Sequence, residues 1–319
     1  MPGCFVVLLA VSSLASSQGG DRWYQALQTP TALSSEQWWQ FHREGYVQLD
    51  GFFGGDRFHL IEDARNDIDQ MWRDGKKRQY QHVYVQETPQ LKGNEQPQTF
   101  PVRLSKVPKS ARESPYRIYF ANKGDGINPW RNLVNDPALT KIVAALVSSS
   151  NFPQAKGPNT TGADPGEHLL VFEWGTQQGM HLDTWYTLGA RTHGMMVAAW
   201  VALDNVTADN GPLLYVPGSH MIMPEVRSRR CNDYSTCRAT PRSAEHRDVE
   251  RDIESRSTRY IEGEIERHGL KRVELRATAG DVFIWHEMLY HGGAPIRDLT
   301  KRRRSCVSHY VAKAEQGGA

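Results

Sequence analysis

The sequence predicts a mainly β fold, a sandwich or barrel of short strands that is buttressed by helices near the N-terminus. Many short β-rich runs separated by turn signals are typical of such folds. The turn signals include Asp-Asn-Gly-Pro at 209–212 and Pro-Gly at 217–218. The β-rich runs are residues 169–172, 195–203, 213–216, 273–277, 282–285 and 306–312.

Helical patterns precede these strands. Ser34 and Gln37 have the spacing of a capping box, and the helix that they predict stops at Gly45. Residues 46–52 alternate like a strand, and Asp56 is the expected cap of a second helix with an apolar stripe over residues 60–72. The buttress is therefore expected to begin as helix, strand, helix.

Further along, Asp136 as cap and Pro137 at the first position predict a helix that runs to residue 147. Residues 74–115 are polar and read as irregular, and residues 148–166 read as a loop because they hold three Pro and three Gly. Residues 221–270 are charged and turn helical around residues 260–265, which indicates an insertion over the β core. We expect a single domain over residues 30–314.

Composition excludes several classes of protein. With 319 residues, 39% of them hydrophobic, the chain is neither a disulfide-built mini-protein nor wholly disordered. A net charge of +2 without long basic runs gives no reason to expect a nucleic-acid partner. The apolar run at residues 5–15 is shorter than the ~20 residues of a membrane-spanning helix, so no stable membrane span is expected.

The compartment stays open at this level. Residues 1–17 are either a signal peptide or a disordered N-terminus, since small residues follow the apolar run but no Lys or Arg precedes it. A signal would direct the protein to the secretory pathway or an organelle, and without one it is cytoplasmic. Cys231 and Cys237 are either a disulfide pair, in an oxidising compartment, or two free thiols, whereas Cys306 lies in an apolar run typical of a core.

His181-Leu182-Asp183 is the first pattern with chemical content. Residues two apart in a strand face the same side, so the imidazole and the carboxylate would point into a barrel together. His291 follows a later strand and is the candidate third ligand, with His286 as its rival. Two histidines and one carboxylate form the facial triad of non-haem iron(II) oxygenases. An H-x-D tripeptide alone is more often an accident of composition.

The three consecutive arginines Arg302, Arg303 and Arg304 follow His291. A guanidinium binds a carboxylate through two parallel hydrogen bonds, as a 2-oxo dicarboxylate would require. Strand parity places Arg303 on one face and the other two on the opposite face, and parity alone does not choose between these sets. The alternative interpretation is a solvated basic edge of a strand.

These segments together resemble the phytanoyl-CoA dioxygenase family of iron(II)/2-oxoglutarate-dependent oxygenases, over about residues 34–312. The resemblance rests on the motifs His-Leu-Asp-Thr-Trp at 181–185, Asp-Asn-Gly-Pro-Leu at 209–213, Pro-Gly-Ser-His at 217–220, Ala-Gly-Asp-Val at 279–282, and His-Gly-Gly at 291–293 with the segment 303–310. It implies a double-stranded β-helix, or jelly-roll, core.

The resemblance also implies the ligands. Iron(II) is expected on His181, Asp183 and His291, with 2-oxoglutarate and dioxygen as co-substrates. Counting back from His309 assigns Arg303 to the distal carboxylate of 2-oxoglutarate, whereas counting forward from His291 assigns Arg302; we prefer Arg303, because an added residue fits a loop better than a strand. Softer implications are that Gln177 or Gln178 contacts a ligand and that Trp200 lines the pocket, although Trp200 reads equally as a core aromatic.

The function expected from the resemblance is oxidation of an unactivated C–H bond in a small metabolite. Hydroxylation, desaturation and oxidative cyclisation in specialised metabolism all fit, and a polar, amino-acid-derived substrate is favoured. The alternative is a catalytically inactive, secreted jelly-roll binding protein. A zinc hydrolase is less favoured, because no His-Glu-x-x-His motif is present. The oligomeric state stays open.

Overall fold

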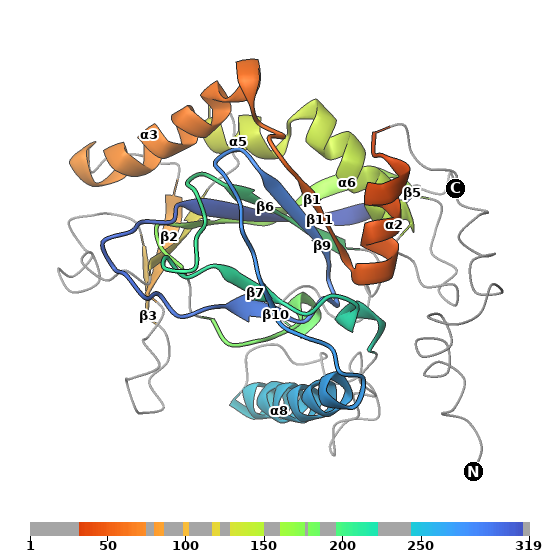
Figure 1. Cartoon of the computed structure of the whole chain (residues 1–319). Coiled ribbons are helices and arrows are strands. Elements are labelled where there is room, and N and C mark those ends of the chain that lie inside the picture. The colour runs from red at the N-terminus through yellow and green to blue at the C-terminus, as the bar shows by residue number, and fades with distance from the viewer. Residues whose placement is uncertain are drawn as a thin grey trace, which may run out of the picture.

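The computed structural model describes residues 32–74, 80–85, 98–101, 117–121, 128–149, 160–175, 178–185, 196–222 and 244–314. Two antiparallel sheets face each other within these residues (Figure 1). The eight-stranded sheet has the order β1 (Tyr46–Leu49), β9 (Val282–His286), β6 (Met196–Ala202), β11 (Ser305–Ala314), β5 (Thr160–Phe172), β4 (Arg117–Ala121), β2 (Tyr80–Val85) and β3 (Gln98–Pro101). The three-stranded sheet has the order β10 (His291–Gly293), β7 (Leu213–Tyr215) and β8 (Val273–Glu274).

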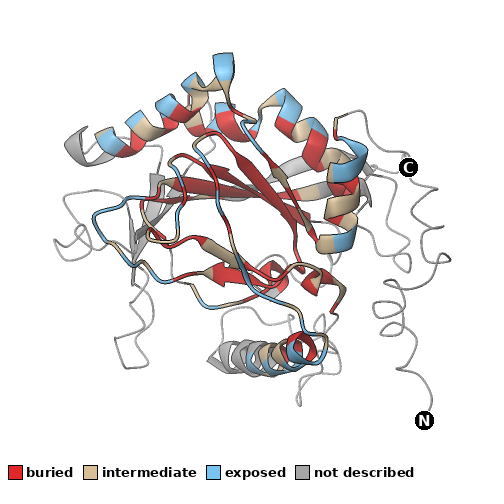
Figure 2. Ribbon diagram, viewed as in Figure 1, coloured by how far each residue is buried: buried red, intermediate tan, exposed pale blue. Residues whose placement is uncertain are grey.

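Helices cover the outer face of the eight-stranded sheet, which confirms the predicted buttress. They are α2 (Ser35–Glu44), α3 (His59–Asp74), α5 (Pro129–Val134) and α6 (Pro137–Ser149) (Figure 1). Their apolar sides pack on the sheet in one cluster, to which Phe41, Ile61, Leu139, Cys306 and Tyr310 belong. Burial of this apolar surface is the main favourable term holding the helices in place. The buried residues in Figure 2 run along the sheet-facing sides of these helices.

Most of the predicted helix boundaries are correct. Ser34 accepts from the Gln37 amide, the Gln37 side chain returns the bond to the Ser34 amide, and Gly45 ends α2 in the left-handed conformation with φ 83°. Asp136 accepts from the first amides of α6. The prediction for Asp56 is wrong, because this residue lies inside a short 3-10 helix (Gly55–Arg57) that precedes α3.

Local sequence signals missed part of the eight-stranded sheet. β2 and β3 form within the polar segment that was predicted to be irregular. β5 begins at Thr160, inside the predicted loop, because it pairs along its length with β11. Among the described strands β4 pairs only with residues 169–172 of β5, so Pro165 is paired on one side alone, with Tyr310 of β11. Tertiary pairing therefore overrode the local turn signals.

The space between the two sheets forms a second apolar layer. Trp200, Tyr215, Phe283, Trp285 and Val307 belong to it. The fold is therefore the predicted mainly β fold, a double-stranded β-helix core with flanking helices.

The expected insertion contains α8 (Ala244–Arg267), which packs below the three-stranded sheet (Figure 1). Its residues Ile261 and Ile265 join a third cluster with Leu182 and Tyr290, the neighbours of candidate metal ligands. Among the described helices, none combines the length and hydropathy that crossing a bilayer requires. Residues 1–17, Cys231 and Cys237 lie outside the described residues.

Candidate metal and 2-oxoglutarate site

The two candidate histidine ligands are joined through their backbones. His181 donates to the carbonyl of His291 at 2.7 Å, and His291 donates back to His181 at 3.0 Å. This is an isolated bridge, and Asp183 begins a 3-10 helix (Asp183–Trp185) whose first amide donates to Glu287. The strand alternation expected for His181 and Asp183 is therefore wrong, although a turn brings both side chains together.

Gly292 permits the close approach of these two segments. A Cβ atom at this position would lie 2.9 Å from the Gln178 carbonyl oxygen and 3.0 Å from the Met180 amide. Both contacts are to backbone, which cannot swing aside as a side chain can. The glycine after His291 thus has a packing reason to be a glycine.

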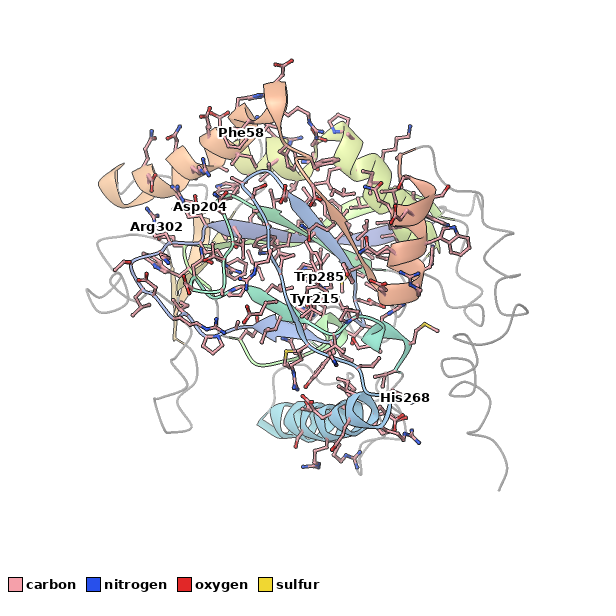
Figure 3. All side chains as sticks on the ribbon, in the orientation of Figure 1. Phe58, Asp204, Tyr215, His268, Trp285 and Arg302 are labelled. Atoms are coloured by element: carbon pink, nitrogen blue, oxygen red, sulfur yellow. The ribbon has the colours of Figure 1, made fainter. Side chains whose placement is uncertain are left out.

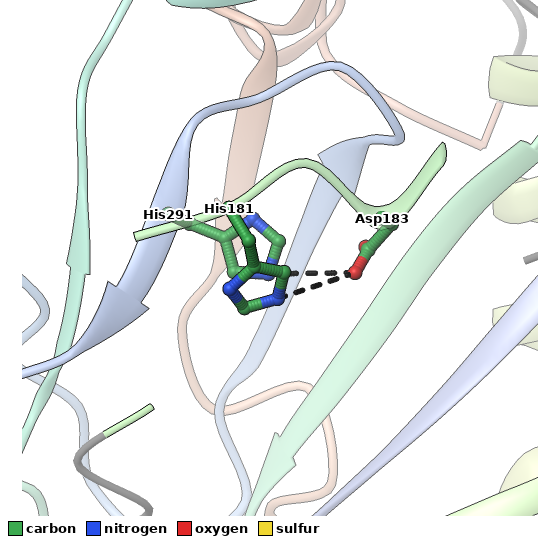
Figure 4. A group of neighbouring side chains, drawn as sticks. All are labelled: His181, Asp183 and His291. Atoms are coloured by element: carbon green, nitrogen blue, oxygen red, sulfur yellow. Dashed lines mark ion pairs between the residues drawn. The ribbon is translucent and has the colours of Figure 1, made fainter. Parts of the chain in front are cut away.

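The three ligand side chains converge on one point (Figure 4). Asp183 Oδ1 lies 3.7 Å from His181 Nε2 and 3.6 Å from His291 Nε2, and one ligand atom from each residue lies within 4.8 Å of the others. Each Nδ1 is 2.8 Å from a backbone carbonyl, that of Gly179 for His181 and that of Leu289 for His291. These carbonyls hold the protons on Nδ1 and leave the Nε2 lone pairs facing Asp183.

The second oxygen of Asp183 is held by two other side chains. The Trp285 indole donates to Asp183 Oδ2 at 2.8 Å, and His309 Nε2 lies 3.3 Å from the same oxygen. The Trp285 ring also lies 4.8 Å from the His291 ring, centroid to centroid. The Trp285 hydrogen bond thus holds Oδ2, with His309 close by, while Oδ1 is the oxygen that lies near both histidines.

The pKa shifts of His181 and Asp183 suit metal binding. Burial, together with nearby His291, lowers the pKa of His181 to about 3. Burial alone would raise the pKa of Asp183, but His291 and His309 outweigh it and hold this pKa well below its usual range. His181 is thus neutral and Asp183 ionised near pH 7, and these are the forms that bind metals.

Arg303 is the arginine that points between the two sheets. Its side chain is 3% exposed, and its guanidinium lies 5.4 Å from the centre of the Trp200 ring. Among the described residues no carboxylate pairs with it; Nε lacks a hydrogen-bond partner, and the one hydrogen bond that the guanidinium makes is a 3.5 Å contact to the Trp174 carbonyl. Burial lowers its pKa to about 10, so the group remains a cation near neutral pH.

Ser305 lies two residues further along the same strand face and is fully buried. Its hydroxyl also has no hydrogen-bond partner within the described part of the chain. A buried cation without a carboxylate and a buried hydroxyl without a hydrogen-bond partner are both costly unless a ligand completes them. Together they form a cradle that fits a carboxylate.

Arg302 and Arg304 are engaged elsewhere. Arg302 pairs with Glu173 at 3.0 Å and Asp69 at 3.2 Å, and Arg304 pairs with Asp204 at 2.8 Å and Asp69 at 2.9 Å. Figure 3 shows Arg302 and Asp204 toward the edge of the molecule, away from Trp285. Strand parity did not say which of the two faces points inward. In the structure Arg303 is the one of the three arginines that points between the sheets.

The remaining sequence candidates fall in different places. Trp200 is 2% exposed and both packs in the core between the sheets and faces Arg303. Gln178 lies beside the His291 strand, where its carbonyl accepts from the Gly293 amide. His286 does not join the triad; its Nδ1 accepts from the Met288 amide and its ring lies 5.6 Å from that of His220. Gln177 lies outside the described residues.

Family and structural comparisons agree with this geometry. A model of the phytanoyl-CoA dioxygenase (PhyH) family matches residues 41–305. The chain belongs to the phytanoyl-CoA dioxygenase family. This confirms the resemblance noted in the sequence, and the family's enzyme class is the non-haem iron, 2-oxoglutarate-dependent dioxygenases. No curated protein sequence matches the chain.

Solved structures support the fold of this family member. AviO1 from Streptomyces viridochromogenes Tue57 is 16% identical, with a TM-score of 0.51 over 91% of this chain and 99% of that chain. The epimerase SnoN from nogalamycin biosynthesis, in complex with Fe3+, alpha ketoglutarate and nogalamycin RO, is 15% identical, with a TM-score of 0.53 over 89% and 91%. EctD from S. alaskensis is 16% identical, with a TM-score of 0.51 over 90% of this chain and 79% of that chain.

Sequence reasoning missed three residues of this family member's site. Ser305 and His309 share the strand face of Arg303, and that alternation was available in the sequence once the inward face was known. Trp285 lies in a β-rich run whose sequence is typical of a buried core strand, so nothing in the sequence marked it as a site residue. Its contact with Asp183 joins residues 102 positions apart, and local periodicity carries no information on such a contact.

Proposed function

We propose that the protein oxidises an unactivated C–H bond of a small metabolite, with iron(II) held by His181, Asp183 and His291 and 2-oxoglutarate anchored by Arg303. The observation that carries this proposal is the pairing of two sites on the inner side of the fold. One is a buried triad of ligand atoms within 4.8 Å, and the other is a buried guanidinium without a carboxylate partner among the described residues.

The residues divide the work between metal and co-substrate. The two Nε2 atoms and Asp183 Oδ1 face one another and would bind one face of an octahedral ion, which leaves three positions for other ligands. Arg303, with the hydroxyl of Ser305, would bind the distal carboxylate of 2-oxoglutarate through charge-assisted hydrogen bonds. The Trp200 ring covers the guanidinium and keeps it from water.

Iron(II) bound at the triad supplies the chemistry that couples dioxygen reduction and decarboxylation of 2-oxoglutarate to C–H oxidation. The chain contributes orientation and exclusion of solvent. Trp285 and His309 hold Asp183 Oδ2, so that the carboxylate offers one oxygen. The ligands are 5% exposed or less, which restricts access of bulk water to the reacting atoms.

Structural relatives support a small-molecule substrate without identifying it. SnoN is an epimerase that was crystallised with nogalamycin RO, and SnoK, from the same pathway, is a carbocyclase with a TM-score of 0.50 to this chain. The fold thus serves outcomes other than hydroxylation in those proteins. For this chain we propose hydroxylation, desaturation or ring closure of an amino-acid-derived metabolite, the class that the sequence favours.

The test of the cofactor assignment is optical. Iron(II) and 2-oxoglutarate are added to the protein without oxygen, and the visible charge-transfer absorption of the chelate is recorded. We expect the absorption in the wild type and in His268→Ala, a histidine away from the site, and its loss in His181→Ala (Figure 3). Absence of the absorption from the wild type would overturn the assignment and favour an inactive binding protein, and equal absorption in the two proteins would exclude His181 as a ligand.

The substrate class is tested by succinate release. The iron-loaded enzyme with 2-oxoglutarate and oxygen is screened against amino-acid derivatives, osmolytes, lipids and aromatic metabolites. We expect the largest stimulation of succinate release from an amino-acid derivative. Stimulation by a lipid thioester alone would contradict the proposed substrate class but leave the cofactor assignment standing.

A further inference from the structure

A line of aromatic side chains leads from the metal ligands toward the edge of the fold. Trp285 bonds Asp183 and lies against His291, as described above. The Phe283 ring lies 5.8 Å from that of Trp285, 4.9 Å from that of Tyr215 and 5.1 Å from that of Tyr46, measured between ring centroids. Trp285 and Tyr215 belong to the same cluster of buried side chains between the sheets, and both are labelled in Figure 3.

Strand register fixes both tyrosines next to the metal site. Tyr215 is the cross-strand partner of His291, and Tyr46 is the cross-strand partner of Trp285. Directly opposite residues of antiparallel strands project their side chains to the same face. The two tyrosine rings meet at a centroid distance of 4.7 Å. The arrangement is therefore built into the sheets and does not depend on a loop.

The tyrosine hydroxyls continue the line toward the surface. Burial and the nearby Tyr46 hydroxyl raise the pKa of Tyr215, and Tyr46 in turn interacts with Glu44 and Gln40. Glu44 is 26% exposed in its side chain and pairs with the solvent-exposed Arg43. A path for a proton thus runs from a buried phenol to a carboxylate at the surface.

Packing alone does not account for these residue types. A phenylalanine at position 215 would fill the same space without burying a hydroxyl that needs a partner. Indole and phenol are the side chains that give up an electron most readily, and a phenol does so only when its proton has an acceptor. Trp285 touches the metal ligands, and the tyrosine pair has such an acceptor in Glu44.

We propose that Trp285, Tyr215 and Tyr46 form an electron-transfer path that discharges the oxidised metal centre when no substrate is bound. The proposal rests on the proposed function, because the iron-dependent reaction supplies the oxidant. Trp285 gives one electron to the centre and recovers it from Tyr215 across Phe283. Tyr215 passes its proton to Tyr46 as Tyr46 passes its own to Glu44, and a radical remains on Tyr215.

The electrons balance over a full unproductive cycle. An enediol reductant such as ascorbate returns an electron and a proton to Tyr215, and the path then operates once more. Dioxygen, 2-oxoglutarate, two electrons and two protons yield succinate, carbon dioxide and water, and the iron returns to iron(II). The path spares Trp285 and the metal ligands from oxidation in these cycles.

The experiment uses the full chain with iron(II), 2-oxoglutarate and oxygen, and without a primary substrate. Electron paramagnetic resonance of samples frozen during the reaction detects a tyrosyl radical, and peptide mass spectrometry measures oxygen added to Trp285. The variants are Tyr215→Phe and Tyr46→Phe, which remove only hydroxyls. Tyr310→Phe is the control, since this buried hydroxyl bonds the Val134 carbonyl on the helix-covered side.

We expect a tyrosyl radical in the wild type and in Tyr310→Phe, its loss in Tyr215→Phe, and a severalfold rise in oxidised Trp285 in both path variants. Equal oxidation of Trp285 in Tyr215→Phe and the control would overturn the path. Slow succinate release from the wild type separates the two failures. If the wild type releases succinate but Trp285 oxidation is the same in Tyr215→Phe and the control, the electron-transfer path is wrong and the proposed function stands. If the wild type releases no succinate, both the proposed function and the path are wrong.

Discussion

Arg303 and Arg304 are neighbours in the sequence, and they show two opposite ways of burying a guanidinium. Arg304 faces Asp204 and Asp69 on the helix side and makes three hydrogen bonds to Asp204 with its backbone amide and guanidinium. Arg303 faces the space between the sheets and meets Trp200. The pKa of Arg304 is raised because bonds to Asp204 outweigh its burial, whereas burial lowers that of Arg303.

This difference separates a guanidinium with carboxylate partners in the chain from one that has none among the described residues. A guanidinium that pairs with a carboxylate of the chain stabilises the fold, and neither group needs a bound ligand to balance its charge. A guanidinium buried without a carboxylate costs stability until a ligand supplies one. Two adjacent arginines thus lie in opposite surroundings, and the proposed function gives Arg303 the binding role.

The largest effect is expected when a candidate metal ligand is removed. Asp183→Ala removes the carboxylate that both histidines face, and no neighbouring carboxylate takes its place in the described site. Loss of a contact that only orients a ligand lowers metal affinity or activity by up to about 100-fold. For Asp183→Ala we expect a larger loss of both iron affinity and succinate release. Iron content after gel filtration measures the binding. His268→Ala should retain iron, and retention by Asp183→Ala would exclude this residue as a ligand.

Arg303→Gln and Arg302→Gln test which of the two arginines binds 2-oxoglutarate. Removing one partner of a buried charge pair costs about 2–5 kcal/mol, which is roughly 30-fold to several thousandfold in affinity. We expect that loss in 2-oxoglutarate binding for Arg303→Gln, measured by calorimetry without oxygen. Arg302→Gln should bind within about twofold of the wild type, because Arg302 pairs with Glu173 and Asp69. The reverse result would assign the co-substrate to Arg302.

Trp285→Phe tests how far the carboxylate depends on its supporting contacts. The change keeps an aromatic ring beside His291 but removes the indole donor to Asp183 Oδ2. We expect iron affinity to fall about tenfold, in the range found for contacts that orient a ligand. Competition with a chromogenic chelator measures the affinity. An unchanged affinity would show that His309 alone suffices to orient Asp183.

Arg304→Gln is expected to act on stability and leave the ligands alone. Loss of its partly buried bonds to Asp204 should lower the free energy of unfolding by about 1–3 kcal/mol, with 2-oxoglutarate affinity unchanged. Urea unfolding of both proteins measures the difference. A weaker affinity for 2-oxoglutarate would place Arg304 in the binding site instead.

The same pair predicts a pH dependence. Burial would raise the pKa of Asp204, but Arg304 outweighs it and the pKa is lowered. A lowered folded-state pKa gives stabilisation that is present above the unfolded value, about 3.9, and is lost as the pH falls through the folded value. The stability difference between wild type and Arg304→Gln should therefore shrink below about pH 4. A constant difference down to pH 2 would contradict the ion pair as its source.

Sequence patterns predicted which candidate ligands lie together better than they predicted the local structure of these residues. His181, Asp183 and His291 do converge, yet through a bridge and a 3-10 turn where a strand was expected. Helix caps such as Ser34 and Asp136 were predictable, because the cap residue and the amide that it satisfies are neighbours in sequence. α5 was missed although Asn128 caps it with Pro129 at the first position.

Long-range contacts account for what sequence reasoning could not supply. β2 and β3 have a polar sequence, and they exist because they pair with each other and with β4. The direction of Arg303 depends on which face of β11 meets the second sheet. Parity divides the two faces but does not name the inner one.

The position of β11 has a consequence for how the protein is made. It is the last of the described strands in chain order, yet it lies between β5 and β6 near the middle of the eight-stranded sheet. During translation both of these strands wait with an open edge until residues 305–314 leave the ribosome. Such edges are templates for pairing with other chains, so β5 and β6 are open to wrong pairing until β11 takes its place between them.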